Sequence, residues 1–506
     1  MNLRFPLYFL TSLLISAAAA GLSSCNSESY YYTEASYTGA AVTSFNLKSN
    51  SDVLDNLDSV YFSIDLVNGR IFNAEPLPKG TPINKLPVTV GSQNVSKVNL
   101  TYRIYGTDRD TTVSYLTSPN DSINFASGPV KLSVTSGDGL TTRDYTIKVN
   151  VYAIEPDTLF WSTKALRTLP SPFDIPVASK ATSRGDETLC LTTSADKAFL
   201  ATSTDLYSGI WSGSEIALPD GADVKSFSAS PDALFIIANG ELYTAAPASV
   251  PQWATTGVKM DYIYGIYEAD SRVLGNVANP DGTYTFVTHP ASAGTPVPAE
   301  MPVSGTSNML TLDSRWSFSP IVMMLGGRLA SGKCTGDMWG YDGSTWTRIS
   351  TRAVTPGEEI AICRYPTIEI NKNSWTFTKR DAIIAIGGQD EKGIVDDIVS
   401  VSYDQGITWA DAATYLELPE PIAGRGGIQL IVRNHTLDLA TATDWSSLPL
   451  EYLSMLRPAD ASRAIKPITQ WECPYIYMFG GHDSQGVLFD QVWRGVINRY
   501  TFVPLY

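Results

Sequence analysis

The feature that most constrains the fold is a repeat in the C-terminal part of the chain, from Glu155 to Tyr506. Each copy has an apolar strand, a Gly-Gly pair, a polar loop, a second strand and an aromatic strand. The clearest copies are Ile321 to Ile349, Ala382 to Ala412 and Tyr475 to Leu505. A repeat of this kind is typical of proteins that stack one supersecondary unit many times. The pattern therefore predicts a repetitive, all-β domain.

The Gly-Gly pairs have a physical rationale. We expect each pair to end an inner strand, where neighbouring repeats crowd and the chain turns with positive φ. The three pairs are Gly326-Gly327, Gly387-Gly388 and Gly480-Gly481. Followed by Tyr341 or Tyr403 and then by Trp346 or Trp409, they resemble the kelch repeat. That resemblance implies a kelch-like β-propeller over residues 156–506.

A second motif overlaps the repeat. Ser402 to Trp409, with the sequence SYDQGITW, resembles the Asp-box of sialidase-like propellers, and Tyr341 to Trp346 looks like a shortened copy. An Asp-box is a turn in which the Asp carboxylate accepts hydrogen bonds from backbone amides and Gly takes the left-handed position. We therefore assign Asp404 a structural role rather than a catalytic one.

Weaker copies precede the three clear ones. The repeats begin near Gly185, Asp223, Val258, Ser307, Glu358 and Gly424. This spacing predicts six blades. The stretch Asp157 to Pro170 is a linker, a closing strand or the remnant of a seventh blade. Arg433 to Gln470 lengthens the last repeat and contains a segment that could form a short helix. We interpret this insertion as surface decoration, with a role in function as the alternative.

The region from Ala40 to Ile154 has a different pattern. Short runs alternate apolar and polar residues, as in Val60 to Leu66 and Tyr145 to Tyr152, and turn signals such as Asn68-Gly69 separate them. A side-chain period of two indicates half-buried strands, and regularly spaced short strands indicate a β-sandwich. The closing sequence SGDGLTTRDYTIKVNV resembles the last hairpin of cadherin-like or Ig-like modules. We expect this domain to span residues 40–155.

The N-terminus carries an export signal. Arg4 precedes an apolar run from Phe5 to Ala20, and small residues lead to Leu22-Ser23-Ser24-Cys25. A charged start, a short apolar region and a small-residue cleavage zone make a secretory signal peptide, here residues 1–24. The last four residues resemble the bacterial lipobox, which implies cleavage before Cys25 and acylation of that residue. Residues 25–39 would then be a tether. The alternative is a secreted protein with a chance Cys at that position.

Composition excludes some partners. The chain has 506 residues and a net charge of −15, and removal of residues 1–24 deletes one basic residue, Arg4. Such acidity argues against nucleic acid, whose binding relies on clustered Lys and Arg. We predict attachment to the membrane only through a lipid on Cys25. The protein is expected in the cell envelope, anchored in the outer membrane on its surface or periplasmic face.

Five cysteines are present. If Cys25 carries lipid, four remain: Cys190, Cys334, Cys363 and Cys473. Their spacing does not match a zinc site, so we predict no metal. Disulfides and buried free thiols are both open, because an exported compartment permits disulfides and sequence does not select a pairing.

A search for catalytic constellations found none. Arg364-Tyr365-Pro366 resembles an element of sialidases but stands in the wrong repeat, and it suits equally the Arg that begins a kelch strand, as does Arg425. A kelch-type copper oxidase needs a ligand set that His289, His435 and His482 do not supply. A sialic acid mutarotase on a kelch propeller needs central Arg and Glu residues that the sequence does not reveal. We predict no cofactor and no catalytic residue.

The remaining candidate site is a binding surface. Loops after the Gly-Gly pairs should lie on one propeller face, where polar side chains suit a carbohydrate or a protein loop. The candidate ligand-binding residues are Arg328, Lys333, Asp390, Lys392, His482 and Asp483. Trp316 and Trp375 are interpreted as core. As a whole the chain resembles uncharacterised Bacteroidota surface lipoproteins that join a cadherin-like module to a kelch-like propeller. We therefore expect a non-enzymatic lipoprotein that binds glycan or protein. The alternative is a glycan-active enzyme, a hydrolase or mutarotase, with charged residues of perturbed pKa converging at the propeller axis.

Overall fold

The structure is a computed structural model of the chain, and it forms two compact units, Met1–Ala153 and Ile154–Tyr506. It describes residues 39–73, 76–151, 158–162, 164–174, 176–291, 293–313, 319–371, 376–394, 399–411, 416–438 and 470–498. The predicted signal peptide, Cys25, the predicted tether to residue 38, Trp316, Trp375 and most of the insertion lie outside these residues. Within them the only helix described over its whole length is the 3-10 turn η1 (Leu57–Ser59), which confirms the all-β prediction.

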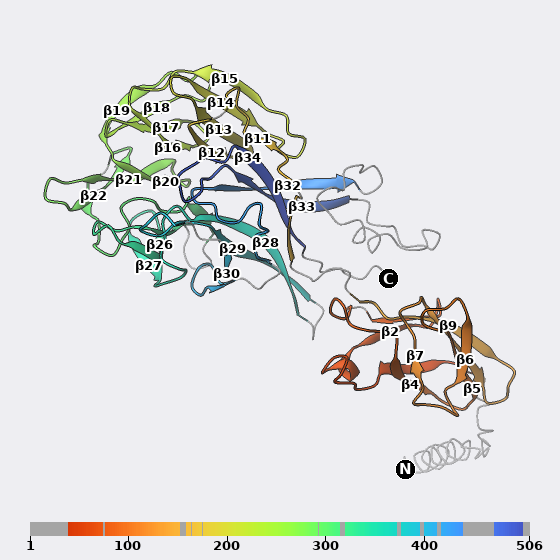
Figure 1. The fold of residues 1–506 in the computed structure, drawn as a ribbon. Helices are drawn as coiled ribbons and strands as arrows, with labels where there is room; N and C mark the ends of the chain where they lie inside the picture. The colour runs from red at the N-terminus through yellow and green to blue at the C-terminus, as the bar shows by residue number, and fades with distance from the viewer. Residues whose placement is uncertain are drawn as a thin grey trace, which may run out of the picture. The chain divides into compact units, whose positions relative to one another are not determined.

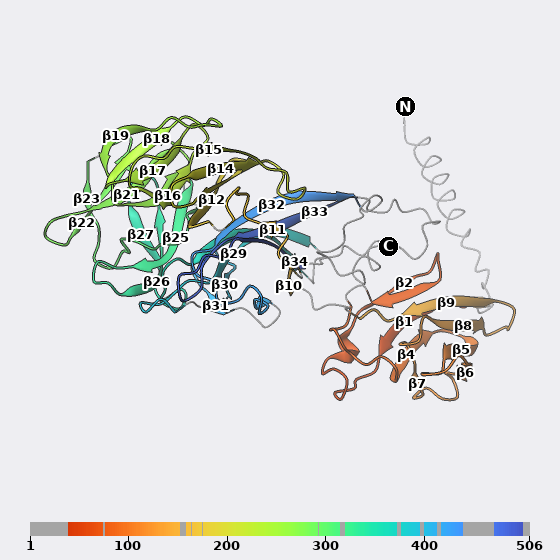
Figure 2. The same ribbon diagram turned by 45° about the horizontal axis from the view of Figure 1, so that its top comes forward.

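The first unit consists of two sheets around one core (Figure 2). The larger sheet has the order β2 (Phe62–Asp65), β3 (Arg70–Asn73), β9 (Thr142–Lys148), β8 (Val130–Ser136), β5 (Val95–Arg103) and β6 (Asp110–Ser114). The smaller has the order β1 (Val42–Leu47), β4 (Leu86–Ser92) and β7 (Ser122–Ile123). Only β3 and β9 pair in parallel among the described strands.

Alternation explains why these strands bury one face. In β8, Val130, Leu132 and Val134 are buried, while Lys131 between them is exposed. Tyr145 on β9 ties the two sheets together, because its hydroxyl accepts a hydrogen bond from the backbone N–H of Val42 on β1, at 3.2 Å. The first unit therefore contains two sheets that share one apolar core.

The second unit contains six antiparallel sheets in its described part, which we number in chain order (Figure 1). Sheets 1 to 3 are β12 (Ala178–Arg184), β13 (Glu187–Thr193), β14 (Ala198–Ser203), β15 (Ser212–Ile216); β16 (Ala222–Ala229), β17 (Leu234–Ala238), β18 (Glu241–Ala245), β19 (Ala254–Lys259); and β20 (Tyr262–Tyr267), β21 (Arg272–Ala278), β22 (Tyr284–His289), β23 (Thr295–Pro296).

Sheets 4 and 5 are β24 (Leu310–Leu312), β25 (Ile321–Arg328), β26 (Cys334–Tyr341), β27 (Trp346–Ser350); and β28 (Ala361–Asn371), β29 (Thr376–Ile386), β30 (Val399–Ser402), β31 (Ala410–Asp411). Sheet 6 is β32 (Gln429–Asp438), β33 (Gln470–Phe479), β34 (Gln491–Asn498) and β10 (Thr158–Trp161), with β11 (Arg167–Thr168) also on β34. The segment left open in the sequence analysis thus supplies closing strands to the last sheet.

The six sheets form a ring, because each interface between neighbouring sheets holds its own apolar cluster. In β25, Val322 and Met324 pack toward sheet 3, whereas Met323 and Leu325 pack toward sheet 5. Another cluster joins the last sheet to the first, with Ala181 of β12 beside Ile431 of β32. The first strand of each sheet lies innermost, and β12 contacts both β16 and β32. Strand alternation therefore fills both faces of every sheet.

The Gly-Gly pairs end the second strands of their sheets, β25, β29 and β33, which are inner strands. All six glycines have positive φ, as predicted. The crowding comes from the segment that leads into the first strand of a sheet. A Cβ on Gly387 would lie 2.4 Å from the carbonyl oxygen of Arg425, which leads into sheet 6, and a Cβ on Gly388 would lie 2.6 Å from Ile360, which leads into its own sheet.

The four described cysteines, Cys190, Cys334, Cys363 and Cys473, are free thiols. Three of them are buried in strands, and burial raises the pKa of Cys190, Cys363 and Cys473 to about 12. These thiols are therefore protonated at neutral pH, and they act as small apolar side chains between the sheets.

Candidate functional site

The candidate site is built on the Gly-Gly turns of sheets 4 to 6. The residue after each pair forms a β-bridge with the segment that leads into its own sheet: Arg328 with Ser304, Gln389 with Glu358, and His482 with Gly426. The lead-in segments are also joined to each other. Glu359 donates its N–H to the Gly305 carbonyl at 2.6 Å, and Gly427 donates to the Glu359 carbonyl at 3.2 Å. The backbone therefore holds the side chains of Arg328, Gln389 and His482 beside one another.

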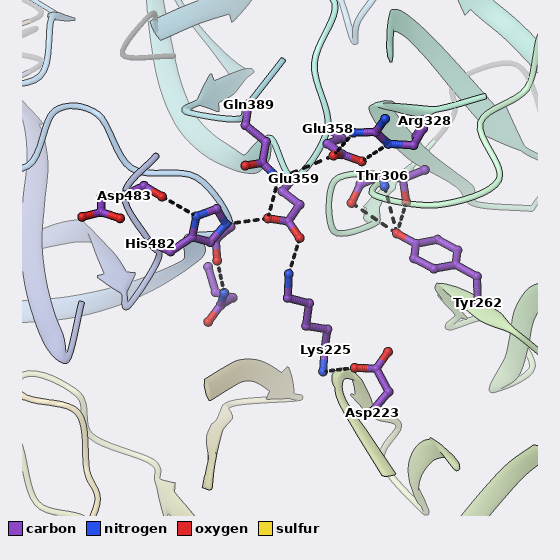
Figure 3. Close-up of polar contacts among 12 residues, drawn as sticks. Asp223, Lys225, Tyr262, Thr306, Arg328, Glu358, Glu359, Gln389, His482 and Asp483 are labelled. Atoms are coloured by element: carbon purple, nitrogen blue, oxygen red, sulfur yellow. Dashed lines mark hydrogen bonds and ion pairs between the residues drawn. The ribbon is translucent and has the colours of Figure 1, made fainter. Parts of the chain in front are cut away.

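Glu358 and Arg328 form the first ion pair of this site (Figure 3). Nε of Arg328 donates to Oε2 of Glu358 at 2.9 Å, and a second, shorter contact joins the guanidinium to Oε1. The bond to Glu358 raises the pKa of Arg328 above its usual value. A bidentate pair of this kind fixes the orientation of both side chains.

Glu359 is the centre of a second group of ion pairs. Its Oε2 lies 2.7 Å from Nε2 of His482, and its Oε1 lies 2.5 Å from Nζ of Lys225, which reaches it from sheet 2 (Figure 3). Burial by itself would raise the pKa of this carboxyl. The hydrogen bond from His482 and the charge of Lys225 outweigh burial and bring the pKa of Glu359 to about 2. Glu359 is therefore ionised throughout the physiological range.

The contacts of His482 favour its charged form. Its Nε2 faces the Glu359 carboxylate, and its Nδ1 lies 3.0 Å from the backbone carbonyl oxygen of Asp483. Because both neighbours are acceptors, both ring nitrogens must carry a proton to satisfy them. The hydrogen bond to Glu359 raises the pKa of His482, against the opposing effect of burial.

The innermost strands of sheets 1 to 3 supply the other polar groups. Lys180 of β12 is half-buried, and burial lowers its pKa, while Glu359 and Asp223 oppose that shift and Lys225 adds to it. Tyr262 of β20 accepts a hydrogen bond from the N–H of Thr306 at 2.9 Å, and burial raises its pKa to about 12. We call the following residues the axial cluster, to which each of the six sheets or its lead-in contributes: Lys180, Asp223, Lys225, Tyr262, Thr306, Arg328, Glu358, Glu359, Gln389 and His482.

The structure divides the candidate ligand-binding residues into three groups. Arg328 and His482 belong to the axial cluster. The carboxylates of Asp390 and Asp483 instead accept hydrogen bonds from backbone N–H groups of their own turns, at 2.8 and 2.9 Å in each case. Lys333 and Lys392 are exposed at the far ends of these turns. The loops after the Gly-Gly pairs therefore bring two of the six residues together.

The other residues weighed from the sequence have structural partners. Arg364 pairs with Asp381 on the neighbouring strand, at 2.7 Å. The guanidinium of Arg425 lies 4.0 Å above the ring of Phe489. Of the histidines, His435 stacks on Tyr207 with ring centroids 3.6 Å apart, and His289 lies edge-on to Phe235. Within the described ranges, no group of three or more His, Cys, Asp or Glu residues is arranged to hold a metal ion.

The turn around Asp404 has the geometry expected from the sequence. The carboxylate accepts hydrogen bonds from the Thr408 N–H at 2.8 Å and from the Ser402 hydroxyl at 2.9 Å. Indole Nε1 of Trp409 donates to the Gly406 carbonyl at 3.0 Å. Asp342 accepts two backbone N–H groups in the corresponding turn of sheet 4. Both turns join the third and fourth strands of their sheets.

Sequence reasoning missed most of the axial cluster. In the sequence, Glu358 and Glu359 only mark the start of a repeat. Alignment of the repeats on their Gly-Gly pairs places these two glutamates at the positions of Ser304-Gly305 and Gly426-Gly427. Lys180 and Lys225 give a second, unspecific signal, since each is a cation inside the first strand of its sheet, ASKATSR and ADVKSFSA.

Comparison with known proteins identifies the second unit. The DUF6242 beta propeller domain matches residues 155–505, and the DUF6242 N-terminal domain, a domain of unknown function, matches residues 38–149. The chain therefore belongs to the DUF6242 family, and its second unit is a β-propeller. No curated protein matches the sequence.

Solved structures give distant likenesses. A DUF4784 family protein from Bacteroides caccae is 8% identical, with a TM-score of 0.27, over 74% of this chain and 97% of that one. The extracellular domain of the putative hybrid two component system BT4673 from B. thetaiotaomicron is 12% identical, with a TM-score of 0.24, over 49% of this chain and 34% of that one. None of the described helices is long and apolar enough to cross a membrane.

Proposed function

We propose that this protein is a binding protein of the cell envelope, and that its propeller recognises a glycan or protein ligand at the axial cluster. One observation carries the proposal: polar side chains from all six sheets converge at one end of the ring. Ion pairs inside a core are weak evidence for stability, because desolvation offsets their attraction. Here Lys225 keeps 68% of its side chain exposed although it pairs with Glu359. Polar groups that are held in fixed positions and remain partly open to solvent can orient a ligand and select for it.

The ionisation states favour binding over catalysis. General acid–base catalysis works best when the catalytic pKa lies near the working pH. Glu359, with a pKa of about 2, is too weak a base for this role, and its hydrogen bond with His482 favours the charged form of the imidazole ring. The Glu359 carboxylate therefore presents a constant charge to a ligand. No cofactor is part of this proposal.

Catalysis is the second candidate. We expected an enzyme of this class to gather charged residues of perturbed pKa at the axis, and Glu359, His482 and Lys180 meet that description. Glu358 and Arg328 also supply a Glu and an Arg, which a mutarotase on this fold would need. The activity would be hydrolysis or anomer interconversion of a glycan. Proton NMR of glycans incubated with the protein distinguishes the candidates, since turnover at catalytic protein concentration would replace the binding proposal.

We also propose a finer architecture for the two units and a location for the protein. The six sheets would be six blades of a kelch-like propeller with Asp-box turns, and the first unit would be an Ig-like or cadherin-like spacer. Cys25 would carry the lipid that holds the protein in the outer membrane. Replacing Cys25 with Ala should leave the protein soluble and without fatty acid. A variant that still partitions into detergent and incorporates labelled fatty acid would contradict the lipid anchor.

One arginine variant and one lysine variant together test the binding site. A glycan-array and protein-pulldown screen with the chain lacking residues 1–37 would first select a ligand. Arg328→Gln in the axial cluster should then weaken binding at least tenfold, or about 1.4 kcal/mol. Lys333→Gln removes a charge at the tip of the same turn and should change binding less than threefold. The reverse order of effects would place the site on the outer loops and overturn the proposal.

A further inference from the structure

Lys180 differs from the other charged members of the axial cluster. Glu358 is paired with Arg328, and Glu359 is paired with both His482 and Lys225. The ammonium group of Lys180, by contrast, makes no hydrogen bond or ion pair with any residue that the structure describes. It lies on the innermost strand β12, half-buried, within electrostatic reach of Glu359, Asp223 and Lys225.

A half-buried cation without a partner is costly for the folded protein. Removing an ammonium group from water is unfavourable unless an opposite charge compensates it. Glu359 does not compensate fully, because its two carboxylate oxygens already bind His482 and Lys225. Asp223 accepts the backbone N–H of Lys225 at 3.0 Å. An anion from outside the protein would satisfy Lys180 without breaking any of these pairs.

We propose that Lys180 binds the carboxylate of a sugar acid, and that the axial cluster is therefore specific for acidic over neutral carbohydrate. This inference rests on the proposed binding function of the cluster and names its ligand class. The anion is the part of the ligand that Lys180 recognises. Lys225, already neutralised by Glu359, contributes less to this selectivity.

Other members of the axial cluster suit the hydroxyl groups of a sugar. Nε2 of Gln389 lies 3.5 Å from oxygens of both Glu358 and Glu359, which is the outer limit of a hydrogen bond, so this amide can turn to a ligand at little cost. The Glu358 and Glu359 carboxylates can accept hydrogen bonds from sugar hydroxyls. Two cluster residues, Tyr262 and Arg328, are of the types that dominate protein–protein interfaces, but Tyr262 is already bonded to Thr306 and Arg328 to Glu358. An acidic peptide is therefore the less favoured source of a carboxylate.

Charge removal and charge retention at one position test this inference. Calorimetric titration of the chain from residue 26 onward would use D-glucuronate and D-galacturonate oligomers, each beside the neutral glucose or galactose oligomer, and a poly-glutamate peptide. We expect a uronate oligomer to bind at least tenfold more tightly than its neutral counterpart. Lys180→Met should reduce that preference to less than twofold, and Lys180→Arg should keep it within threefold of the natural protein.

The control is Lys259→Met, which removes the same charge from the outermost strand of sheet 2, where Lys259 is exposed. It should leave uronate binding unchanged. Equal binding of acidic and neutral oligomers, binding of the peptide in place of the uronates, or an unchanged preference in Lys180→Met would each overturn the inference. These outcomes are separate from the test of the proposed function, in which Arg328→Gln is compared with Lys333→Gln for binding of the screened ligand.

Discussion

The two halves of the propeller reach the axis by different means. Sheets 4 to 6 carry Gly-Gly pairs, and they present Arg328, Gln389 and His482 from turns that are bridged to the lead-in segments. Sheets 1 to 3 lack these pairs, and they present Lys180, Lys225 and Tyr262 from the innermost strands themselves. The Gly-Gly repeats therefore describe only sheets 4 to 6, whereas the axial cluster takes residues from both halves of the ring.

Sheet 2 shows what replaces the Gly-Gly turn. Its second strand ends in Asn239-Gly240, both with positive φ, and the third strand begins at once with Glu241. Such a two-residue turn is typical of a tight hairpin. The longer turns of sheets 4 to 6 carry polar side chains beside the lead-in segments. This difference predicts that sheets 4 to 6 are less tolerant of substitution at the turn than sheets 1 to 3.

The largest expected effect is at Gly387. Gly387→Ala would combine a φ of +69° with a Cβ only 2.4 Å from the Arg425 carbonyl oxygen, and it should lower the free energy of unfolding by about 3 kcal/mol or more. Gly282→Ala in sheet 3 has a φ of +82° but no atom within 4 Å of the new Cβ, so it should cost only about 1 kcal/mol. Urea unfolding of both variants measures the difference. Equal costs would show that conformation, and not crowding, selects glycine in the Gly-Gly turns.

The next largest effect is expected at Glu359, which links sheets 4 to 6 with sheet 2 through its pair with Lys225. Glu359→Gln breaks the pairs with His482 and Lys225 and should lower the free energy of unfolding by about 2 kcal/mol near pH 5.5. The Glu359 contribution is present above an unfolded-state pKa of about 4.3 and is lost as the pH falls toward about 2. The His482 contribution is full below about pH 6.5 and is lost as the pH rises through its raised pKa.

Thermal melting at several pH values measures this dependence. The natural protein should gain stability from these two groups between about pH 4.3 and 6.5, and the variant should lose that component. Glu215→Gln, which breaks an exposed pair with Lys197 on sheet 1, is the matched control and should change stability by about 0.5 kcal/mol or less. A Glu359→Gln profile parallel to that of the natural protein would mean that the pair does not join the halves.

The smallest effect concerns the turn at Asp404. Asp404→Ala removes the acceptor for Thr408 and Ser402 and should lower the free energy of unfolding by about 1 kcal/mol, without loss of ligand binding. Asp281 caps a turn of sheet 3 through Thr283 alone, and Asp281→Ala should cost less. Melting and ligand titration of the two variants give the comparison. Loss of binding by Asp404→Ala with unchanged melting would give this residue a functional role.

Periodicity in the sequence predicted the all-β class and the repeating sheets, because strand alternation and glycine turns are local properties. It placed Arg328 and His482 in the candidate site for the same reason, since both follow a Gly-Gly pair. It also placed Asp390 and Asp483 in the candidate site, but their carboxylates accept hydrogen bonds from backbone N–H groups of their own turns. Which polar residues face the axis depends instead on contacts between sheets far apart in the sequence, as for Lys225 and Glu359, and a single sequence does not encode these as a pattern.

Chemical labelling of lysines tests the central claim, that the axial cluster and not the outer loops binds the ligand. Amine-reactive labelling with mass-spectrometric readout would compare Lys180 and Lys225 with Lys333 and Lys392 in the same chain, with and without the glycan or protein selected by the screen. We predict that the ligand slows labelling of Lys180 and Lys225 at least fivefold, while labelling of Lys333 and Lys392 is unchanged. Protection of Lys333 and Lys392 with no protection of the axial lysines would contradict the account.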